Sequence, residues 1–247
     1  MGYVLAGEED IIVLDGGTVQ EAEQLENLIL KLGGRVKSWF LTHPHFDHVE
    51  GAAEVWRRGN ICVENICFRF PPLSYVERLE ARDGRRCVVP LVLESAYASG
   101  ARIVTPTKGT LMSAGHFKVT PLTDGAPCGE DLNCSSVVYR VQTQGAPILF
   151  LGDLGIAGEK SLLREFPNEL CCPIVQMAHH GQRGVSEEFY KFVSPKICLW
   201  PTPLWLWNND QGLGFNTGPY RTVITRSWIE KLESENLNSF DRIAILE

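Results

Sequence analysis

Three times in this chain, a short apolar run typical of a β-strand ends in a few polar residues and is followed by a helical pattern. The three units are residues 36–41 leading into 42–48 and a helix over 49–58, residues 147–151 leading into 152–153 and a helix near 159–166, and residues 173–178 leading into 179–181 and a helix near 186–193. Strands that alternate with helices predict sheets covered by helices rather than an all-α or all-β body. The polar groups then lie at the ends of strands.

Other patterns extend this layered arrangement along the chain. Strands are expected at 3–5, 11–14, 61–67, 102–105, 117–121, 136–141, 196–200 and 242–246, and further helices at 18–32, 74–81 and 220–233. Thr18 and Glu21 form a capping-box pattern at the start of the first of these helices, and Gly33-Gly34 follows its last apolar position. No stretch has the composition of a linker, so we expect one α/β domain over residues 1–247, with sheets packed face to face and helices outside.

Composition limits the class of partner. The 247 residues are 44% hydrophobic and 21% charged, with a formal net charge of −7 and no block of lysine or arginine. Tight sequence-independent binding to duplex nucleic acid is not expected, since it relies on basic side chains that neutralise phosphates. The apolar runs are far shorter than the roughly 18 residues of a membrane span, and the first residues lack the basic and apolar regions of a signal peptide. We expect a cytoplasmic protein that acts on a small molecule.

Eight cysteines are scattered along the chain without a CxxC pair. A chain of this length buries enough apolar surface to fold without disulfides. We therefore predict reduced thiols, most of them in or near the core. Cys171 and Cys172 precede an expected buried strand, so packing is favoured for them over redox chemistry.

Five of the six histidines fall in two short clusters, each where an expected strand meets a loop. His43 and His45 are two residues apart, so in an extended segment their rings point to the same side and can share one metal ion. Asp47 and His48 follow in the turn and can serve a second ion. Imidazole and carboxylate together suit a divalent cation, Zn²⁺ first, with Mn²⁺ or iron as alternatives. The plainer alternative is a polar loop whose side chains only cap the following helix.

These residues resemble the metallo-β-lactamase superfamily. The run HPHFDHVEG at 43–51 is similar to that family's first metal motif. Its other motifs are resembled, in the family's order, by Asp15-Gly16-Gly17, Leu151-Gly152-Asp153 and His179-His180-Gly181. The resemblance covers most of the chain and implies an αββα sandwich, with a hydrolytic site for two metal ions, usually zinc, along one edge of the two sheets.

The resemblance also implies a role for each residue. The implied ligands are His43 and His45 for the first ion, Asp47, His48 and His180 for the second, and Asp153 as a bridge between both. The doublet leaves open which imidazole binds metal; we favour His180, with His179 facing the substrate and donating a proton to the leaving oxygen. Asp47 or Asp153 would orient the attacking hydroxide. Asp15 is expected to orient a ligand histidine rather than to bind metal.

One position departs from the family pattern. Many members place a third histidine for the first ion shortly before the strand of the bridging aspartate, and this chain has Asn133 there. An amide oxygen is a weaker ligand than imidazole, so we expect the first ion to be held less tightly or to keep an extra water. Asparagine here, with the His-His-Gly motif, resembles the branch of DNA-uptake-channel hydrolase domains and phosphorylcholine esterases, which implies phosphodiester cleavage. His116, the remaining histidine, is expected to be structural.

Trp205 and Trp207 lie in a stretch rich in proline and asparagine, residues 200–210, that is typical of a loop. Because this loop follows an expected strand, it can overhang the site and stack on an aromatic, choline-like or nucleobase-bearing substrate. A core plug or a contact with another subunit is an equal alternative. The sequence therefore leaves the oligomeric state open.

The sequence predicts a metal-dependent hydrolase, with phosphodiesters as the first candidate substrates. Hydrolysis of a carboxylic ester, thioester or lactone is the alternative, because the same hydroxide attacks a carbonyl carbon. A third class is an iron-binding oxidoreductase. It is disfavoured because relatives that handle oxygen with two irons carry a glutamate in place of the second histidine, whereas His45 is present.

Overall fold

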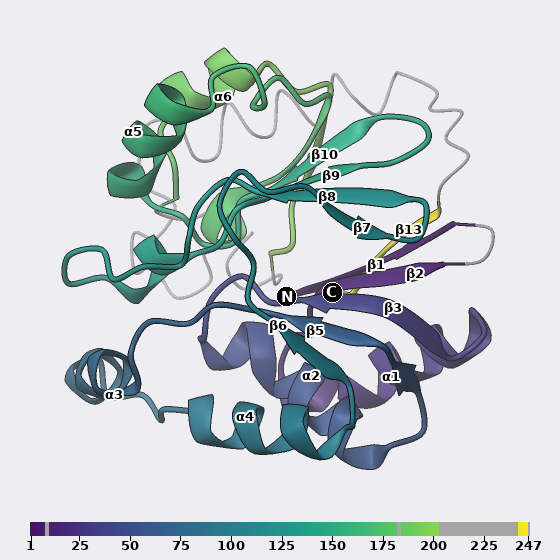
Figure 1. Cartoon of the computed structure of the whole chain (residues 1–247). Coiled ribbons are helices and arrows are strands. Elements are labelled where there is room, and N and C mark those ends of the chain that lie inside the picture. The colour runs from purple at the N-terminus through teal and green to yellow at the C-terminus, as the bar shows by residue number, and fades with distance from the viewer. Residues whose placement is uncertain (8–9, 182–183, 203–241, 247) are drawn as a thin grey trace.

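The computed structural model describes residues 1–7, 10–181, 184–202 and 242–246. Two β-sheets are stacked in the middle of the molecule, with helices on both outer faces (Figure 1). The expected αββα sandwich of two mixed sheets is confirmed. Each sheet has helices on one face and the other sheet on its second face, which explains why β1 (Gly2–Ala6) and β2 (Ile11–Asp15) are buried along their whole length.

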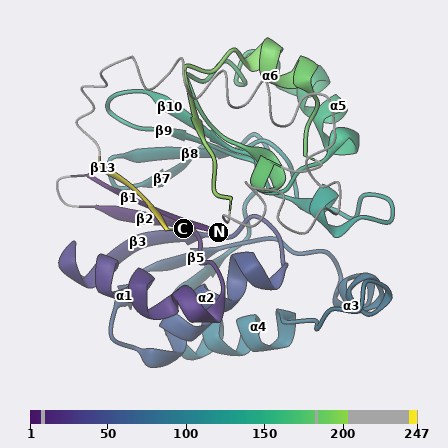
Figure 2. The same cartoon turned by 180° about the vertical axis from the view of Figure 1, so that it is seen from behind.

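The first sheet is built mainly from the N-terminal half, in the order β13-β1-β2-β3-β5-β6, with β4 also paired to β3. Its strands are β1 (Gly2–Ala6), β2 (Ile11–Asp15), β3 (Arg35–Phe40), β4 (Cys62–Val63), β5 (Asn65–Cys67), β6 (Arg102–Val104) and β13 (Arg242–Leu246). β1 pairs antiparallel with β2 and β13, so the two ends marked in Figures 1 and 2 lie side by side. β2, β3, β5 and β6 run parallel.

The second sheet has the order β12-β11-β10-β9-β8-β7. Its strands are β7 (Met112–Ala114), β8 (Phe117–Pro121), β9 (Tyr139–Gln142), β10 (Pro147–Phe150), β11 (Ile174–Gln176) and β12 (Ile197–Leu199). β10, β11 and β12 are parallel, while β7, β8 and β9 form an antiparallel meander that continues into β10. Both sheets therefore contain a group of neighbouring parallel strands whose carboxyl ends share one edge.

The helices divide between the two outer faces. The α-helices are α1 (Ala22–Lys31), α2 (Phe46–Arg58), α3 (Leu73–Arg82), α4 (Val89–Ala98), α5 (Ile156–Glu165) and α6 (Glu187–Val193), and the 3₁₀ turns are η1 (Val19–Glu21), η2 (Leu132–Ser135) and η3 (Ala178–Gly181). Figure 2 shows α1, α2 and α4 over the first sheet and α5 and α6 over the second, while α3 lies to one side beside α4. From this position at the side of the first sheet, Glu80 of α3 lies 3.8 Å from His45.

The contact between the sheets is apolar and rich in aromatic rings. Tyr3 packs on Phe150 with ring centroids 5.1 Å apart, and Phe40 on Tyr139 at 5.2 Å. All four side chains are at most 1% exposed, and burying a side chain of this size stabilises a fold by about 1.5–3 kcal/mol. The core thus fixes the two sheets against each other, which in turn fixes the shared edge where their parallel strands end.

Several expected boundaries change. α4 lies where no helix was expected, and its Pro90 occupies the first helical turn, where proline is tolerated. α2 begins at Phe46 rather than at residue 49, so Asp47 and His48 are helical. The expected strand at 61–67 is divided into β4 and β5. The strand at 242–246 is confirmed, and the helix expected at 220–233 lies outside the described residues.

The prediction that all cysteines are reduced thiols is wrong for two of them. Cys128 and Cys134 form a disulfide with their Cα atoms 5.4 Å apart. Their six-residue spacing has no recognised motif, and the second cysteine lies in the turn η2. The prediction that both Cys171 and Cys172 pack in the core is wrong for Cys171, which is exposed, and right for Cys172, which is buried.

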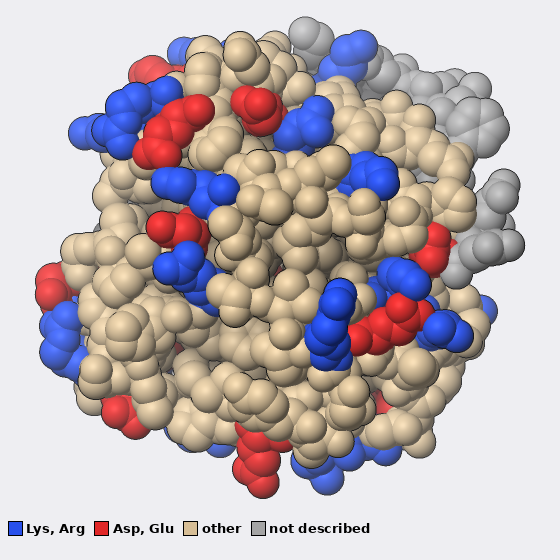
Figure 3. Space-filling view, in the orientation of Figure 1, with Lys and Arg blue, Asp and Glu red and all other residues tan. Residues whose placement is uncertain are grey.

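The charges on one face of the surface and the hydropathy of the described helices bear on the expectations about charge and membrane spans. On the face seen in Figure 3, basic and acidic side chains are interspersed, and neither sign forms a continuous area. Within residues 1–7, 10–181, 184–202 and 242–246, a helix of the length and hydropathy required to cross a membrane is not found.

Candidate metal centre

The predicted ligands lie where parallel strands of both sheets end. The segment 41–45 follows β3 of the first sheet, Gly152-Asp153 follows β10 of the second, and His179-His180 follows its neighbour β11. Loops at the carboxyl ends of parallel strands are the usual place for a ligand site in open α/β sheets. The packing of the two sheets brings these three loops to one place.

His43 and His45 sit in the extended segment between β3 and α2. Their rings lie close together, with Nε2 of His43 3.0 Å from Nδ1 of His45. His45 has extended backbone angles and is the residue directly before α2, so Asp47 and His48 follow in the first helical turn. The change from strand to helix therefore turns four side chains of one short segment toward a common centre.

Helix α2 packs closely against the turn after β2 through glycine residues of both segments. A Cβ atom on Gly51 of α2 would lie 2.0 Å from the carbonyl oxygen of Gly16. The backbone N–H of Gly51 donates to the carbonyl oxygen of Gly17 at 2.9 Å, and that of Gly16 to the carbonyl of His48 at 2.7 Å. Only residues without side chains allow this approach, which explains the glycine that ends the motif HPHFDHVEG.

Asp153 lies at the centre of the histidines. Gly152, the residue before it, has a left-handed backbone with φ 57°, and a Cβ atom on it would clash with Thr42. Glycine at this position therefore allows the turn that brings Asp153 to the histidines. The backbone N–H of Asp153 donates to Oγ of Ser136 at 3.1 Å. Its carboxylate is within 4 Å of four imidazole Nε2 atoms: 3.2 Å from His48, 3.7 Å from His43 and His180, and 3.9 Å from His179.

The histidine doublet is held in an unusual backbone conformation. His179 and His180 both have left-handed angles, with φ 51° and 53°, which cost non-glycine residues about 1–2 kcal/mol each. Surrounding hydrogen bonds maintain them: Nδ1 of His180 contacts the carbonyl oxygen of Pro201 at 2.9 Å, and the indole N–H of Trp200 donates to the carbonyl of His180 at 2.7 Å. The conformation turns Nε2 of His180 to Asp47, 3.1 Å from its carboxylate.

Asp15 contacts a ligand histidine from outside the cluster. Its Oδ2 lies 2.8 Å from Nδ1 of His48, while Thr42 donates to the same carboxylate through its backbone N–H and its hydroxyl, both at 2.8 Å. Asp15 is 1% exposed and, like the doublet, has a left-handed backbone, with φ 56°. This is the arrangement expected of a residue that orients an imidazole.

The ligand atoms form two groups. The first comprises His43, His45 and Asp153, the second Asp47, His48 and His180, and within each group the ligand atoms lie within 4.8 Å of one another. The resemblance implied the same two groups, except that it assigned Asp153 to both ions, and the roles of these residues as ligands stay a prediction. Asp153 joins the two groups through its short distance to His48.

Burial and charge set the protonation of the cluster. Burial lowers the pKa of His45 to about 4 and holds the pKa of His43 well below its usual range. Burial alone would also lower the pKa of His48, but the carboxylates of Asp153 and Asp15 raise it to about 10. Burial would raise the pKa of Asp153, yet the surrounding imidazoles, His48 first, hold it well below its usual range. Two neutral imidazoles and an ionised carboxylate are ready to bind a cation.

Two buried atoms without a well-formed hydrogen bond are consistent with a metal site. Nε2 of His48 and Oδ1 of Asp153 are buried and make no hydrogen bond of normal geometry with the described residues, although they lie 3.2 Å apart and pair as ions while His48 is protonated. Buried polar atoms are normally satisfied, and an unsatisfied one costs free energy. A divalent cation would satisfy both, and imidazole with carboxylate is a donor set that zinc and related metals accept.

Four other predicted residues have different outcomes. Asn133 lies in η2 and is 8% exposed, with Oδ1 buried and without a hydrogen-bond partner among the described residues. His116 lies outside both ligand groups, where its Nδ1 contacts Asp10 at 2.7 Å. Trp205 and Trp207 lie outside the described residues.

Several supporting residues were not singled out from the sequence. Gln176, fully buried at the end of β11, accepts the backbone N–H groups of Leu151 and Gly152, both at 2.8 Å, and thereby fixes the approach to Asp153. Glu80 and Arg85, from α3 and the turn after it, contact His45. A buried glutamine at a strand end is a weak signal, and the α3 contacts have none in the local sequence.

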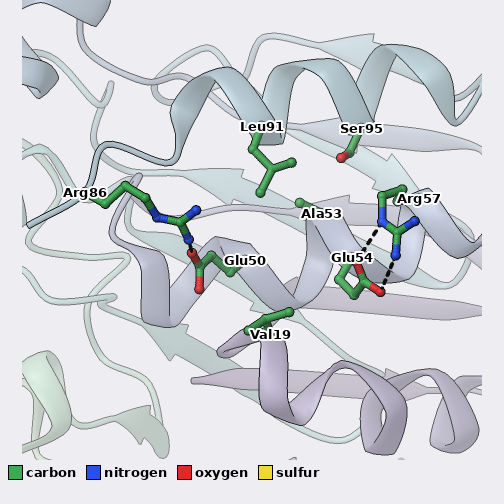
Figure 4. A pocket seen from close by; sticks show the side chains of 8 residues that line it. All are labelled: Val19, Glu50, Ala53, Glu54, Arg57, Arg86, Leu91 and Ser95. Carbon is green, nitrogen blue, oxygen red and sulfur yellow. Dashed lines mark hydrogen bonds and ion pairs between the residues drawn. The ribbon is translucent and has the colours of Figure 1, made fainter.

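A separate small pocket lies over the first sheet (Figure 4). It has a volume of about 180 Å³ and is lined by residues of η1, α2 and α4 together with Arg86. Its charged side chains are paired with each other, Arg86 with Glu50 and Arg57 with Glu54. None of the predicted metal ligands lines it.

Comparison with known proteins places the chain in a family. The model of the metallo-β-lactamase superfamily matches residues 2–233, and the chain belongs to that superfamily. ComE operon protein 3 of Bacillus subtilis (strain 168) is 28% identical over 160 residues, which are 64% of this chain and 19% of that protein. The chain thus covers about a fifth of the length of this relative. The match supports the branch to which Asn133 and the His-His-Gly motif pointed.

Solved structures show a likeness of fold. The metallo-β-lactamase fold protein YhfI from Bacillus subtilis is 12% identical, with a TM-score of 0.45, over 71% of this chain and 62% of that one. A B3 metallo-β-lactamase described as having an active-site glutamic acid is 16% identical, with a TM-score of 0.49, over 78% and 79% of the two chains.

Proposed function

We propose that this chain is a metal-dependent hydrolase that works with two divalent cations, Zn²⁺ first, and cleaves a phosphodiester or a related ester. The observation that carries the proposal is the position of Asp153 between the two ligand groups, 3.7 Å from His43 of the first and 3.2 Å from His48 of the second. A buried carboxylate in this position is what a bridging ligand requires.

The carboxylates at the site suit the attacking step. Bound as a pair, divalent cations lower the pKa of a water molecule toward neutrality and polarise the oxygen of the group under attack. The hydrogen bond from His180 holds the pKa of Asp47 below its usual range despite burial, and the imidazoles do the same for Asp153. Both carboxylates are therefore ionised, and each is able to accept a hydrogen bond from the attacking water and to orient it.

His179 suits the departing group. Its side chain is 22% exposed, against 12% for His180, and its Nε2 lies 3.9 Å from Asp153. We therefore assign His180 to the second cation and His179 to the open side of the site. There the imidazole donates a proton to the leaving oxygen.

Two observations favour an anionic ester. Arg85 places a guanidinium beside His45, with Nη1 3.2 Å from Nε2, and a cation near the ligand cluster favours a negatively charged substrate. The match to ComE operon protein 3 supports the assignment of this chain to the branch for which the resemblance implies phosphodiester cleavage. We take the substrate to be a small molecule, and Asn133 to contact the substrate or to hold the first cation weakly.

The proposal is tested with a substrate panel. Chain purified without chelator is analysed for zinc, manganese and iron, and is then assayed with bis-aryl phosphodiester, phosphomonoester, thioester, lactone and β-lactam substrates under each metal. Preference for the phosphodiester with two metal ions per chain supports the proposal. Turnover of lactone or thioester alone selects the alternative ester hydrolase, and a metal-free chain with no activity on any substrate overturns it.

A further inference from the structure

The side of His45 that faces away from the other ligands has its own contacts. Nδ1 of His45 faces the cluster, 3.0 Å from His43, so Nε2 points outward. Oε1 of Glu80 lies 3.8 Å from this Nε2, and Nη1 of Arg85 lies 3.2 Å from it. Both come from the end of α3 and the turn after it, where the backbone N–H of Arg85 donates to the carbonyl oxygen of Glu80 at 2.8 Å.

The carboxyl group of Glu80 lacks a partner that explains its burial. Its side chain is 2% exposed, and Oε2 is buried without a hydrogen-bond partner among the described residues. Glutamate is almost never fully buried unless it is paired, because an unpaired buried carboxyl group costs free energy. The ionisable group within 4 Å of this carboxylate, among the described residues, is the outward nitrogen of His45.

The chemistry of imidazole separates the two neighbours of His45. An imidazole that binds a cation through Nδ1 carries its proton on Nε2, and this N–H can only donate. A carboxylate accepts such a bond, whereas a guanidinium has donors alone and cannot. The contact of Arg85 with Nε2 therefore belongs to a His45 without a cation, and Glu80 is the partner suited to the cation-bound form.

We propose that Glu80 is a positioning residue that fixes His45 for metal binding through Nε2–H, and that Arg85 competes for the same nitrogen when no cation is bound. The proposal rests on the proposed function, because it takes His45 as a ligand. It gives the two residues opposite effects: loss of Glu80 weakens metal binding, and loss of Arg85 strengthens it. Release from His45 also frees the guanidinium of Arg85 for an anionic substrate.

The test measures the affinity of the whole chain for Zn²⁺ by competition with a chromophoric chelator. Loss of the partner of a ligand imidazole costs about 10–100-fold in affinity, which is expected for Glu80→Ala. Glu80→Gln, which keeps an acceptor oxygen without the charge, loses less. Arg85→Ala binds Zn²⁺ more tightly than the wild type. Glu77→Gln and Arg82→Ala, exposed positions on the same helix, serve as matched controls and leave the affinity unchanged.

A second readout separates positioning from stability. In Zn²⁺-loaded chain labelled with ¹⁵N-histidine, the Nε2 proton of His45 is expected to exchange slowly with solvent, and to exchange faster in Glu80→Ala. Thermal unfolding of the cation-free variants shows whether they fold; where Glu80→Ala does not, the nearly isosteric Glu80→Gln decides.

The outcomes are distinguishable. A wild type that binds no Zn²⁺ overturns the proposed function as well. A wild type that binds Zn²⁺, with folded Glu80 variants of equal affinity and unchanged proton exchange, overturns the role of Glu80 alone. Weaker or unchanged binding by Arg85→Ala overturns the competition.

Discussion

Oδ2 of Asp15 lies 2.8 Å from Nδ1 of His48, and this contact decides which nitrogen of His48 faces the ligand cluster. With Nδ1 engaged, Nε2 is turned to Asp153. A carboxylate in this position fixes the tautomer and raises the basicity of a ligand imidazole. The end of the second strand of the fold thereby acts on a site whose proposed ligands all come from later in the chain.

Replacement of Asp15 by asparagine tests this relationship. Asparagine tolerates the left-handed backbone found at this position, so the fold is expected to survive. We expect Asp15→Asn to weaken Zn²⁺ binding by about 10–100-fold, measured by chelator competition. Asp10→Asn, which removes the charge beside His116 and lies away from both ligand groups, is the control. Equal affinity in the two variants contradicts the assigned role.

Asp153→Ala removes the carboxylate shared by both ligand groups. Because four imidazole nitrogens lie within 4 Å of it, we expect loss of metal-dependent hydrolysis together with a fall in bound metal, measured by rate assays and elemental analysis. Asp124→Asn, outside both ligand groups, should keep activity and metal. An Asp153→Ala chain with full activity and full metal content would refute the proposed site.

Replacement of His179 and of His180 should have different effects on metal content and on rate. His180→Ala is expected to lower metal content, whereas His179→Ala should keep the metal and slow the reaction by about 10²–10⁴-fold for substrates with alkoxide leaving groups. A nitrophenolate leaves without needing a proton, so hydrolysis of a nitrophenyl substrate should be slowed much less by His179→Ala. His116→Ala is the control. Equal losses with both leaving groups would remove His179 from the proton-donating role.

The protonated His48 predicts a pH dependence of stability for the cation-free chain. Folding raises its pKa to about 10, while an unfolded imidazole titrates near 6.5, so the folded state binds more protons between these values. The contribution of His48 is complete below pH 6.5 and is lost as the pH rises toward 10. Urea unfolding with chelator present should show the free energy of unfolding falling between pH 7 and 8.5, by at most about 1.4 kcal/mol per pH unit.

His48→Gln is the matched variant for this measurement, since it cannot hold the proton. It should lack the downward slope between pH 7 and 8.5. A wild type whose free energy of unfolding is level or rises over this range would show that His48 does not retain its proton in the folded chain.

The reactivity of the free cysteines toward alkylation should follow their exposure. Burial raises the pKa of Cys67 and Cys198 to about 12, so neither forms the reactive thiolate in the folded chain. Cys62 and Cys171 are exposed. We expect iodoacetamide to label these two in native protein and the buried thiols only after unfolding, with mass spectrometry as the readout. Labelling of Cys67 at the rate of Cys62 would contradict the burial.

The sequence was sufficient for the parts of the site that are local. Residues 42–48 lie on one continuous strand-to-helix segment, so their spacing alone places the side chains together. The order of the motifs then related this segment to Asp153 and His180, and the structure places Asp153 3.2 Å from His48 and His180 3.1 Å from Asp47. Apolar periodicity likewise predicted four of the helices on the two outer faces, α1, α2, α5 and α6.

Long-range contacts could not be read in this way. Glu80 reaches His45 only because α3 lies beside α4 at the side of the first sheet, and nothing in LSYVERLEAR distinguishes this glutamate from its exposed neighbour Glu77. The disulfide between Cys128 and Cys134 depends on a turn with no cysteine motif. α4 escaped detection because proline in a first helical turn resembles a break.

The centre is shared between the two sheets: His43, His45 and His48 follow β3 in one, while Asp153 and His180 follow β10 and β11 in the other. A backbone cut in the connection that joins the sheets, near residues 105–111, would leave each fragment with only part of the donor set. Co-expressed fragments should therefore associate more strongly when zinc is supplied, which would make the centre a cross-link between two halves as well as a place of reaction.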